Sequence, residues 1–147
     1  MKTKTWILVA NAAEAKILTT DNLRVGELEL VREFAHPESR KKASELMSDK
    51  PGHFKTDGNA HSAYSSKSDP KEVEAEHFAI QLAHELKASW DKNQYKKLII
   101  VTSAHFYGLI KKHMHDNHAL EVIHILKDYT RYPISRLHES LKEQLLV

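Results

Sequence analysis

The sequence predicts an α/β fold, a mixed five-stranded sheet in the order 3-2-1-4-5 with helices on both faces. One observation is a pair of continuous apolar runs, Thr5–Asn11 and Lys97–Thr102, whose composition is typical of strands buried on both faces. The other is the order of the remaining patterns: three strand-like segments come first, and later strands alternate with helices. We therefore expect the first run at the centre of one domain that includes all 147 residues.

The first third of the chain predicts an antiparallel meander. A very tight reversal after Thr5–Asn11 leads into the alternating segment 14–20. Segment 27–35 alternates cleanly and predicts a third strand with one wetter face, near the edge of the sheet. It ends at His36-Pro37, because proline cannot donate to the ladder. A short charged helix is expected over 38–47.

A segment without hydrophobic periodicity, about 48–69, follows that helix. It contains Pro51, Gly52, Asp57-Gly58 and many serines. Loops of this length inside a compact domain are uncommon and are usually functional or disordered. This loop is the strongest functional indication that composition provides.

The rest of the chain alternates helices and strands. Asp69 is expected as the N-cap of a long helix, with Pro70 at its first position and Glu72 closing a capping box. This helix extends to about Trp90. A strand over 97–102, a short helix after Ser103, a strand over 121–126 and a C-terminal helix opened by Pro133 complete the pattern. The residues of the long helix expected to face the sheet are Ala75, Phe78, Ala79, Leu82, Leu86 and Trp90.

Composition excludes several classes of protein. The formal net charge of +2 gives no global basic field of the kind that marks an obligate nucleic-acid binder. The absence of cysteine excludes disulfides, thiol catalysis and cysteine-ligated zinc, and it fits a reducing compartment. No apolar run approaches the roughly 20 residues that span a bilayer. The N-terminal apolar run is too short for a signal peptide, so we expect a cytoplasmic protein.

Several segments, in order, resemble one bacterial family, the proteins required for attachment to host cells. They are WILVANAAEAKI, EFAHPESRKKASELMSDKPGHF, SDPKEVEAEHFAIQLAHELKA, KLIIVTSAHFYGLIKKHM and ILKDYTRYP. The family is in turn similar to the middle domain of archaeo-eukaryotic peptide-chain-release factors. That resemblance implies a ribosome-linked ancestry, and the expected strand order is the ribonuclease-H-like arrangement.

The catalytic signatures of these related folds are missing. The release-factor domain carries Gly-Gly-Gln in the loop before its main helix, whereas this chain has Asp57-Gly58-Asn59-Ala60 there. Family members often carry an acidic residue where this chain has Asn11. Nuclease chemistry needs several convergent carboxylates, and the first strand offers none. The chain also has no GxSxG turn and no Gly-rich phosphate loop.

Polar residues follow three of the predicted strands. They lie at the carboxyl ends of these strands, which is where open α/β sheets usually bind their ligands. They are Asn11, Ser103, His105, Lys127 and Asp128. One interpretation is a small pocket for an anion or phosphate, assisted by the N-terminus of the helix after Ser103. The other is purely structural, with Ser103 capping that helix, Asn11 bonding the tight turn, and the Lys127–Asp128 pair solvated.

The middle third is locally basic and carries aromatic residues, which suits RNA. The residues predicted to contact RNA or a protein partner are Arg40, Lys41, Lys50, His53, Lys55, Asn59 and His61. The alternative is a solvated face with acidic neighbours. His113, His115 and His118 cluster near the end of the third helix, but 113 and 115 lie on different helix faces, so no metal and no cofactor is expected.

Two functional hypotheses follow. The first is a non-enzymatic binding protein that engages RNA, the ribosome or a protein partner through the loop at 48–69, with host attachment as an indirect effect. The second is a small hydrolase or a nucleotide- or phosphate-binding enzyme using Asn11, His105 and Lys127.

Overall fold

The computed structural model describes residues 4–40, 69–114 and 119–145. The described elements, in chain order, are β1 (Thr5–Ala10), β2 (Glu14–Thr20), β3 (Glu29–Ala35), the 3-10 helix η1 (Pro37–Arg40), α3 (Pro70–Asp91), β4 (Lys97–Val101), α4 (Ala104–His113), β5 (Glu121–Ile125) and α5 (Ile134–Leu145).

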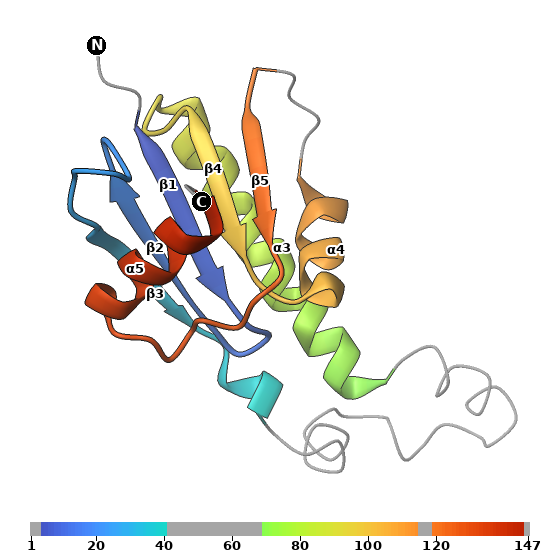
Figure 1. The fold of residues 1–147 in the computed structure, drawn as a ribbon. Helices are drawn as coiled ribbons and strands as arrows, with labels where there is room; N and C mark the ends of the chain where they lie inside the picture. The colour runs from blue at the N-terminus through green and yellow to red at the C-terminus, as the bar shows by residue number, and fades with distance from the viewer. Residues whose placement is uncertain (1–3, 41–68, 115–118, 146–147) are drawn as a thin grey trace, which may run out of the picture.

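The five strands form one mixed sheet in the predicted order, β3-β2-β1-β4-β5 (Figure 1). β1 pairs antiparallel with β2 and parallel with β4, and β4 pairs parallel with β5. The prediction of strand order and strand direction is therefore confirmed. The carboxyl ends of β1, β4 and β5 consequently share one end of the molecule, which we call the carboxyl end.

Helices cover both faces of the sheet, as the sequence predicted (Figure 1). A hydrophobic core lies on each face of the sheet. β1 contributes side chains to both cores, because successive side chains of a strand point to opposite faces. Trp6 and Leu8 belong to the core under α3 and α4. Ile7 and Val9 belong to the core under α5. This is why β1 lacks the polar alternation of a strand with one wet face.

The α3/α4 face carries the aromatic part of the core. Phe78 of α3 is fully buried and its ring centroid lies 6.0 Å from that of Phe106 in α4. Trp6 stacks on Tyr95 at 4.9 Å, and the Tyr95 hydroxyl donates to the Leu86 carbonyl at 2.7 Å. Burial raises the pKa of Tyr95 well above its usual range. Most predicted core positions of α3 are confirmed, although Trp90 is only partly buried.

The α5 face is thinner. α5 contributes Leu137 and Leu141, both fully buried against Ile7, Val9 and Leu18. The segment before α5 adds Tyr129, whose ring stacks on that of Tyr132 at 4.7 Å. One short helix and one loop therefore cover this face.

β3 differs from the prediction. It begins at Glu29 rather than Glu27, and its residues 29–33 are exposed on both faces instead of one. Ile17 pairs with Arg32 whereas Leu18 pairs with Leu30, so Val31 is the extra residue of a β-bulge. Such bulges bend a strand and blunt a sheet edge, and periodicity does not reveal them.

Two further predictions need correction or fall outside the described residues. The sequence predicted a helix over 38–47, but the chain forms the 3-10 helix η1 at the start of this range. Pro37 starts a tight turn there, in which the Ser39 N–H donates to the His36 carbonyl. Asp69 caps α3 as predicted, but the Glu72 carboxylate contacts His105 rather than closing a capping box. Residues 41–68, which include nearly all of the predicted loop, lie outside the described residues.

Candidate functional site

Asn11, at the carboxyl end of β1, holds the turn between β1 and β2. Its Oδ1 accepts hydrogen bonds from the backbone N–H groups of Ala13 and Glu14, both at 2.8 Å. Its Nδ2 donates to Thr130 Oγ1 at 3.2 Å. Asx side chains commonly stabilise turns in this way. The side chain therefore ties the turn to the segment that precedes α5.

Asp128 and Thr130 continue the same network. Asp128 Oδ1 accepts from the Thr130 hydroxyl at 2.5 Å and from the Thr130 N–H at 3.1 Å. Thr130 is buried, whereas Asp128 is exposed. Thus Asn11 and Asp128, distant in sequence, are brought together through Thr130, which sequence reasoning had not singled out.

Ser103 and His105 act at the start of α4. The Ser103 hydroxyl oxygen accepts from the Phe106 N–H at 3.2 Å and caps the helix. His105 Nε2 lies 2.8 Å from a carboxylate oxygen of Glu72 in α3, and this pair is largely exposed. Lys127 is also exposed. The described contacts of Asn11 and Ser103 match the structural interpretation, while a ligand-binding role for the five strand-end residues stays a prediction.

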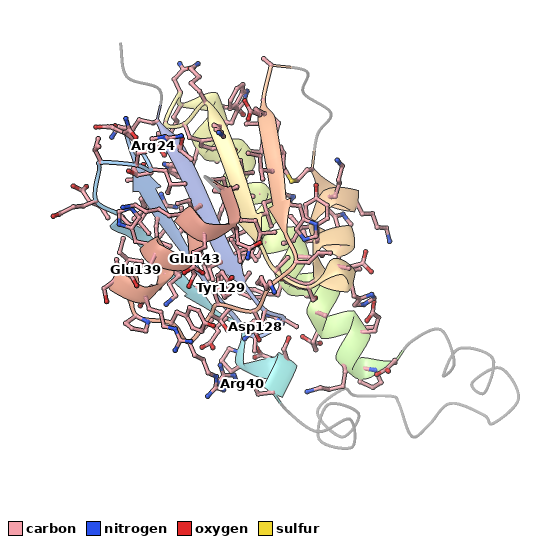
Figure 2. The ribbon with its side chains drawn as sticks, in the orientation of Figure 1. Arg24, Arg40, Asp128, Tyr129, Glu139 and Glu143 are labelled. Atoms are coloured by element: carbon pink, nitrogen blue, oxygen red, sulfur yellow. The ribbon has the colours of Figure 1, made fainter. Side chains whose placement is uncertain are left out.

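Arg40 is the only described residue of the predicted RNA-binding set. Its guanidinium lies 2.9 Å from Glu14 Oε2, which joins η1 to the β1–β2 turn at the carboxyl end. Figure 2 shows Arg40 at the same end of the molecule as Asp128. The remaining predicted residues lie outside the described residues; they are Lys41, Lys50, His53, Lys55, Asn59 and His61.

A basic and aromatic surface lies beside this network, and sequence reasoning missed it. The Arg136 guanidinium sits over the Tyr132 ring at 4.1 Å, and Lys16 Nζ donates to the Tyr132 carbonyl at 3.3 Å. Arg131 is exposed next to them in the chain. We call Lys16, Arg131, Tyr132 and Arg136 the Tyr132 surface. The alternation of arginine and tyrosine in TRYPISR was the available signal, but nothing in it indicated the contribution of Lys16 from β2.

A second contact group joins the end of β3 to α3. Glu74 is 5% exposed, and its Oε1 lies 3.0 Å from His36 Nε2 and 3.5 Å from His77 Nδ1. The His36 ring stacks on Phe78 at 5.5 Å. A buried carboxylate requires such partners. No sequence pattern indicated this pairing, because neither histidine stands in a motif.

The histidine cluster near the end of α4 has a described partner on α3. His113 Nε2 lies 2.7 Å from Glu76 Oε2, and Lys112 Nζ donates to the same oxygen at 2.9 Å. Hydrogen bonds from Lys112 and then His113 lower the pKa of Glu76. His115 and His118 lie outside the described residues. Within residues 4–40, 69–114 and 119–145, no group of three or more acidic, histidine or cysteine side chains could hold a metal ion.

A groove opens where β2 and β3 approach Thr130. It has a volume of about 310 Å³. Its lining combines charged and apolar residues from both strands and from β1, namely Val9, Glu14, Ala15, Lys16, Glu33, Phe34, Ala35 and Thr130. The sequence did not predict it, because the lining comes from three strands and a distant loop.

Nearby, Tyr129 has a raised pKa, chiefly because burial disfavours the phenolate. The neighbouring Gln144 of α5 opposes this rise in the pKa of Tyr129. Figure 2 shows Tyr129 close to Glu143 of the same helix. Tyr129 is therefore a neutral packing residue under α5 at physiological pH.

The family comparison covers most of the chain. A family described as "Protein required for attachment to host cells" matches residues 6–141. The chain therefore belongs to this family, as the resemblance in the sequence implied. No curated protein matches the chain. Among the helices that the structure describes, none combines the length and the apolar character needed to span a membrane.

Proposed function

We propose that this member of the host-attachment family is a binding protein that engages RNA, and that attachment to host cells is its indirect consequence. The observation that carries the proposal is the Tyr132 surface. Its guanidinium is layered on an aromatic ring, with the Lys16 ammonium beside it. Cations position phosphates, and the outer plane of a guanidinium can stack on an unpaired base.

The preorganisation of Arg136 supports this role. The guanidinium carbon lies over the Tyr132 ring at 4.1 Å from its centroid, and one of the guanidinium N–H groups donates to the Tyr132 hydroxyl at 3.4 Å. A planar guanidinium held in this way loses less conformational entropy on binding than a free side chain. Its remaining donors suit a phosphate.

Further cationic residues stand in the part of the sequence that begins at Arg40. Arg40 lies at the carboxyl end, and Lys41, Lys42, Lys50 and Lys55 follow it in the chain. The resemblance to the release-factor middle domain and to the ribonuclease-H-like arrangement suggests ribosomal RNA as the partner. The cysteine-free composition suggests action in the cytoplasm.

The test is binding to a fluorescein-labelled single-stranded RNA across a range of salt concentrations, with co-sedimentation with ribosomes as a second readout. We expect binding that weakens as salt rises, because phosphate contacts release counterions. The double variant Arg131→Glu, Arg136→Glu should bind at least about tenfold more weakly and show a shallower salt dependence.

The matched control is Arg24→Glu combined with Lys92→Glu. Figure 2 shows Arg24 at the end of the molecule opposite Arg40, and Lys92 precedes β4 at that same opposite end. Both residues are exposed. Equal losses in the two double variants, or no RNA binding by the wild-type protein at low salt, would overturn the proposal.

A further inference from the structure

The two edge strands of the sheet differ in how well they are protected against pairing with another strand. β3 carries the bulge at Val31, and its exposed residues include Glu29, Arg32 and Glu33. A bulge and charged side chains of this kind discourage strand pairing. β5, at the other edge (Figure 1), keeps an unbroken register with β4 and contains no proline. Its one carboxylate, Glu121, stands at its first position.

The outer edge of β5 presents backbone groups that no described partner uses. The Ile125 carbonyl accepts from the Thr102 N–H at 3.1 Å, so the backbone groups of Ile125 point toward β4. Because these groups alternate in direction along a strand, those of Val122 and His124 point away from the sheet. Within residues 4–40, 69–114 and 119–145, neither residue uses its backbone N–H or C=O in another hydrogen bond. A strand laid along this edge would satisfy these groups.

Side chains on both faces of β5 offer contacts to such a strand. On the α5 face, Ile123 is only partly buried, and Leu126, directly after β5, is 59% exposed. On the other face, the His124 ring stacks on Tyr107 of α4, with ring centroids 3.7 Å apart. Apolar and aromatic side chains beside an open edge favour an extended segment with apolar residues at alternate positions.

The cations beside this edge favour an acidic segment. α4, whose Tyr107 contacts β5, contains no aspartate or glutamate. Lys111 Nζ lies over the Tyr107 ring at 5.9 Å, and Lys127 follows β5 at its carboxyl end. Both lysines are exposed, and neither has a carboxylate partner among the residues that the structure describes.

The two carboxylates nearest to β5 in the chain are already engaged. Glu121 Oε2 lies 3.5 Å from Lys97 Nζ, and Asp128 Oδ1 accepts from the Thr130 hydroxyl. A second copy of this chain, paired through its own β5, would bring the lysines of another α4 to the same edge. Like charges oppose that arrangement, so an acidic partner fits the edge better than a second copy does.

We propose that the outer edge of β5 binds an extended acidic segment of a partner protein by strand addition. Backbone hydrogen bonds to Val122 and His124 hold the segment in place. Its alternate apolar residues lie beside Ile123, and its acidic residues meet Lys111 and Lys127. This edge is separate from the Tyr132 surface, so the inference goes beyond the proposed RNA binding.

The test is titration of the ¹⁵N-labelled full-length chain with a short synthetic peptide of alternating valine and threonine that carries an aspartate at each end. We expect saturable amide shifts at residues 121–126 and a dissociation constant below about 1 mM. The amides of Val122 and His124 should become protected from hydrogen exchange, because strand addition gives them acceptors. The same peptide with lysine in place of both aspartates, or with methylated backbone nitrogens, should bind at least about tenfold more weakly.

Two variants separate strand pairing from charge. Val122→Pro removes an outward N–H without removing a hydrogen bond to β4, a change that edge strands tolerate, and it should weaken peptide binding at least about tenfold. The double variant Lys111→Glu, Lys127→Glu should weaken binding by a similar factor. The matched control, Arg24→Glu combined with Lys92→Glu, changes the net charge equally outside β5 and should bind as the wild-type protein does. Circular dichroism and urea denaturation check the folding of each variant.

No saturable shifts up to about 10 mM peptide, equal binding of the lysine peptide, or undiminished binding by either folded variant would overturn the proposal. A dimer of the chain without peptide that dissociates in Val122→Pro would also overturn it and assign the edge to a second copy. The variant Arg131→Glu, Arg136→Glu should bind the peptide as the wild-type protein does. RNA binding measured on the same samples therefore distinguishes a failure of this proposal from a failure of the proposed function.

Discussion

The two faces of the sheet are covered by different numbers of helices. The α3/α4 face is covered by two helices and packs Trp6, Phe78, Tyr95 and Phe106 into one core. The α5 face is covered by one helix and the loop before it, and α5 contributes the fully buried Leu137 and Leu141. Figure 1 shows α5 crossing the sheet at an angle, opposite α3 and α4.

The proposed RNA-binding surface lies on the thinner of the two faces. On the α5 face, hydrogen bonds attach the loop before α5 to the sheet. Asn11 donates to Thr130, whose hydroxyl donates to Asp128. Lys16 donates to the Tyr132 carbonyl. Both the Tyr132 surface and the groove adjoin these contacts. A thick aromatic face can hold the sheet rigid while the thin face keeps charged groups accessible. Loops on a rigid scaffold commonly carry binding residues for this reason.

The largest expected effect tests the thick face. Phe78 is fully buried among the helices and the sheet. Phe78→Ala should lower the free energy of unfolding by about 3–5 kcal/mol, because it leaves a large cavity. Leu141→Ala on the α5 face should cost about 2–4 kcal/mol. Urea denaturation followed by circular dichroism measures both values.

The opposite order, with a larger loss of unfolding free energy for Leu141→Ala than for Phe78→Ala, would contradict this view of the two faces. A greater loss for Leu141→Ala would mean that α5 carries the fold. Leu126→Ala is a matched control, since Leu126 is 59% exposed and should change stability little.

The next effect tests the polar covering of the thin face. Asn11→Ala removes the acceptor of two backbone N–H groups and the donor to Thr130. We expect a loss of about 1–2 kcal/mol, because the side chain is only partly buried and water can replace part of these bonds. Thermal and urea unfolding measure this loss.

The isosteric variant sharpens this prediction. Asn11→Asp keeps the acceptor of the turn but cannot donate to Thr130, and it brings a second carboxylate toward Asp128. It should lose less stability than Asn11→Ala. A larger loss would show that charge near Asp128, and not the turn, controls this part of the molecule.

The fold was predictable from sequence because its strongest signals are local. The apolar runs of β1 and β4, and the Asp69-Pro70 start of α3, specify elements whose order fixes the strand order. The bulge at Val31 was not predictable, since it is set by the pairing of two strands rather than by either sequence.

The candidate site was predicted only in part. Ser103 and Asn11 form the local hydrogen bonds that their residue types favour at helix starts and turns. Contacts such as Lys16 with Tyr132 or His36 with Glu74 join residues far apart in the chain. Periodicity places an element on a face, but it does not specify which side chains meet across elements.

A smaller effect concerns the polar group inside the aromatic core. The Tyr95 hydroxyl donates to the Leu86 carbonyl at 2.7 Å and is buried. Tyr95→Phe should cost about 1 kcal/mol, because the ring stack with Trp6 survives while the hydrogen bond is lost. Urea denaturation at pH 7 measures this cost. A loss above about 3 kcal/mol would mean that this hydrogen bond, rather than ring packing, organises the thick face.

The smallest expected effect lies on the outer side of the thick face, where Glu76 of α3 meets Lys112 and His113 of α4. The pKa of Glu76 is lowered on folding, so its ionised form stabilises the protein above the unfolded-state value of 4.5, and this contribution disappears as the pH falls through the folded-state pKa. Glu76→Gln should therefore cost below about 1 kcal/mol at pH 6, because the pair is partly exposed. The difference from wild type should shrink below pH 4.5. Urea titrations from pH 7 to pH 3 measure it, and Lys112→Met should remove most of it in a double-mutant cycle. A difference that grows at low pH would show that the carboxylate is destabilised in the folded protein.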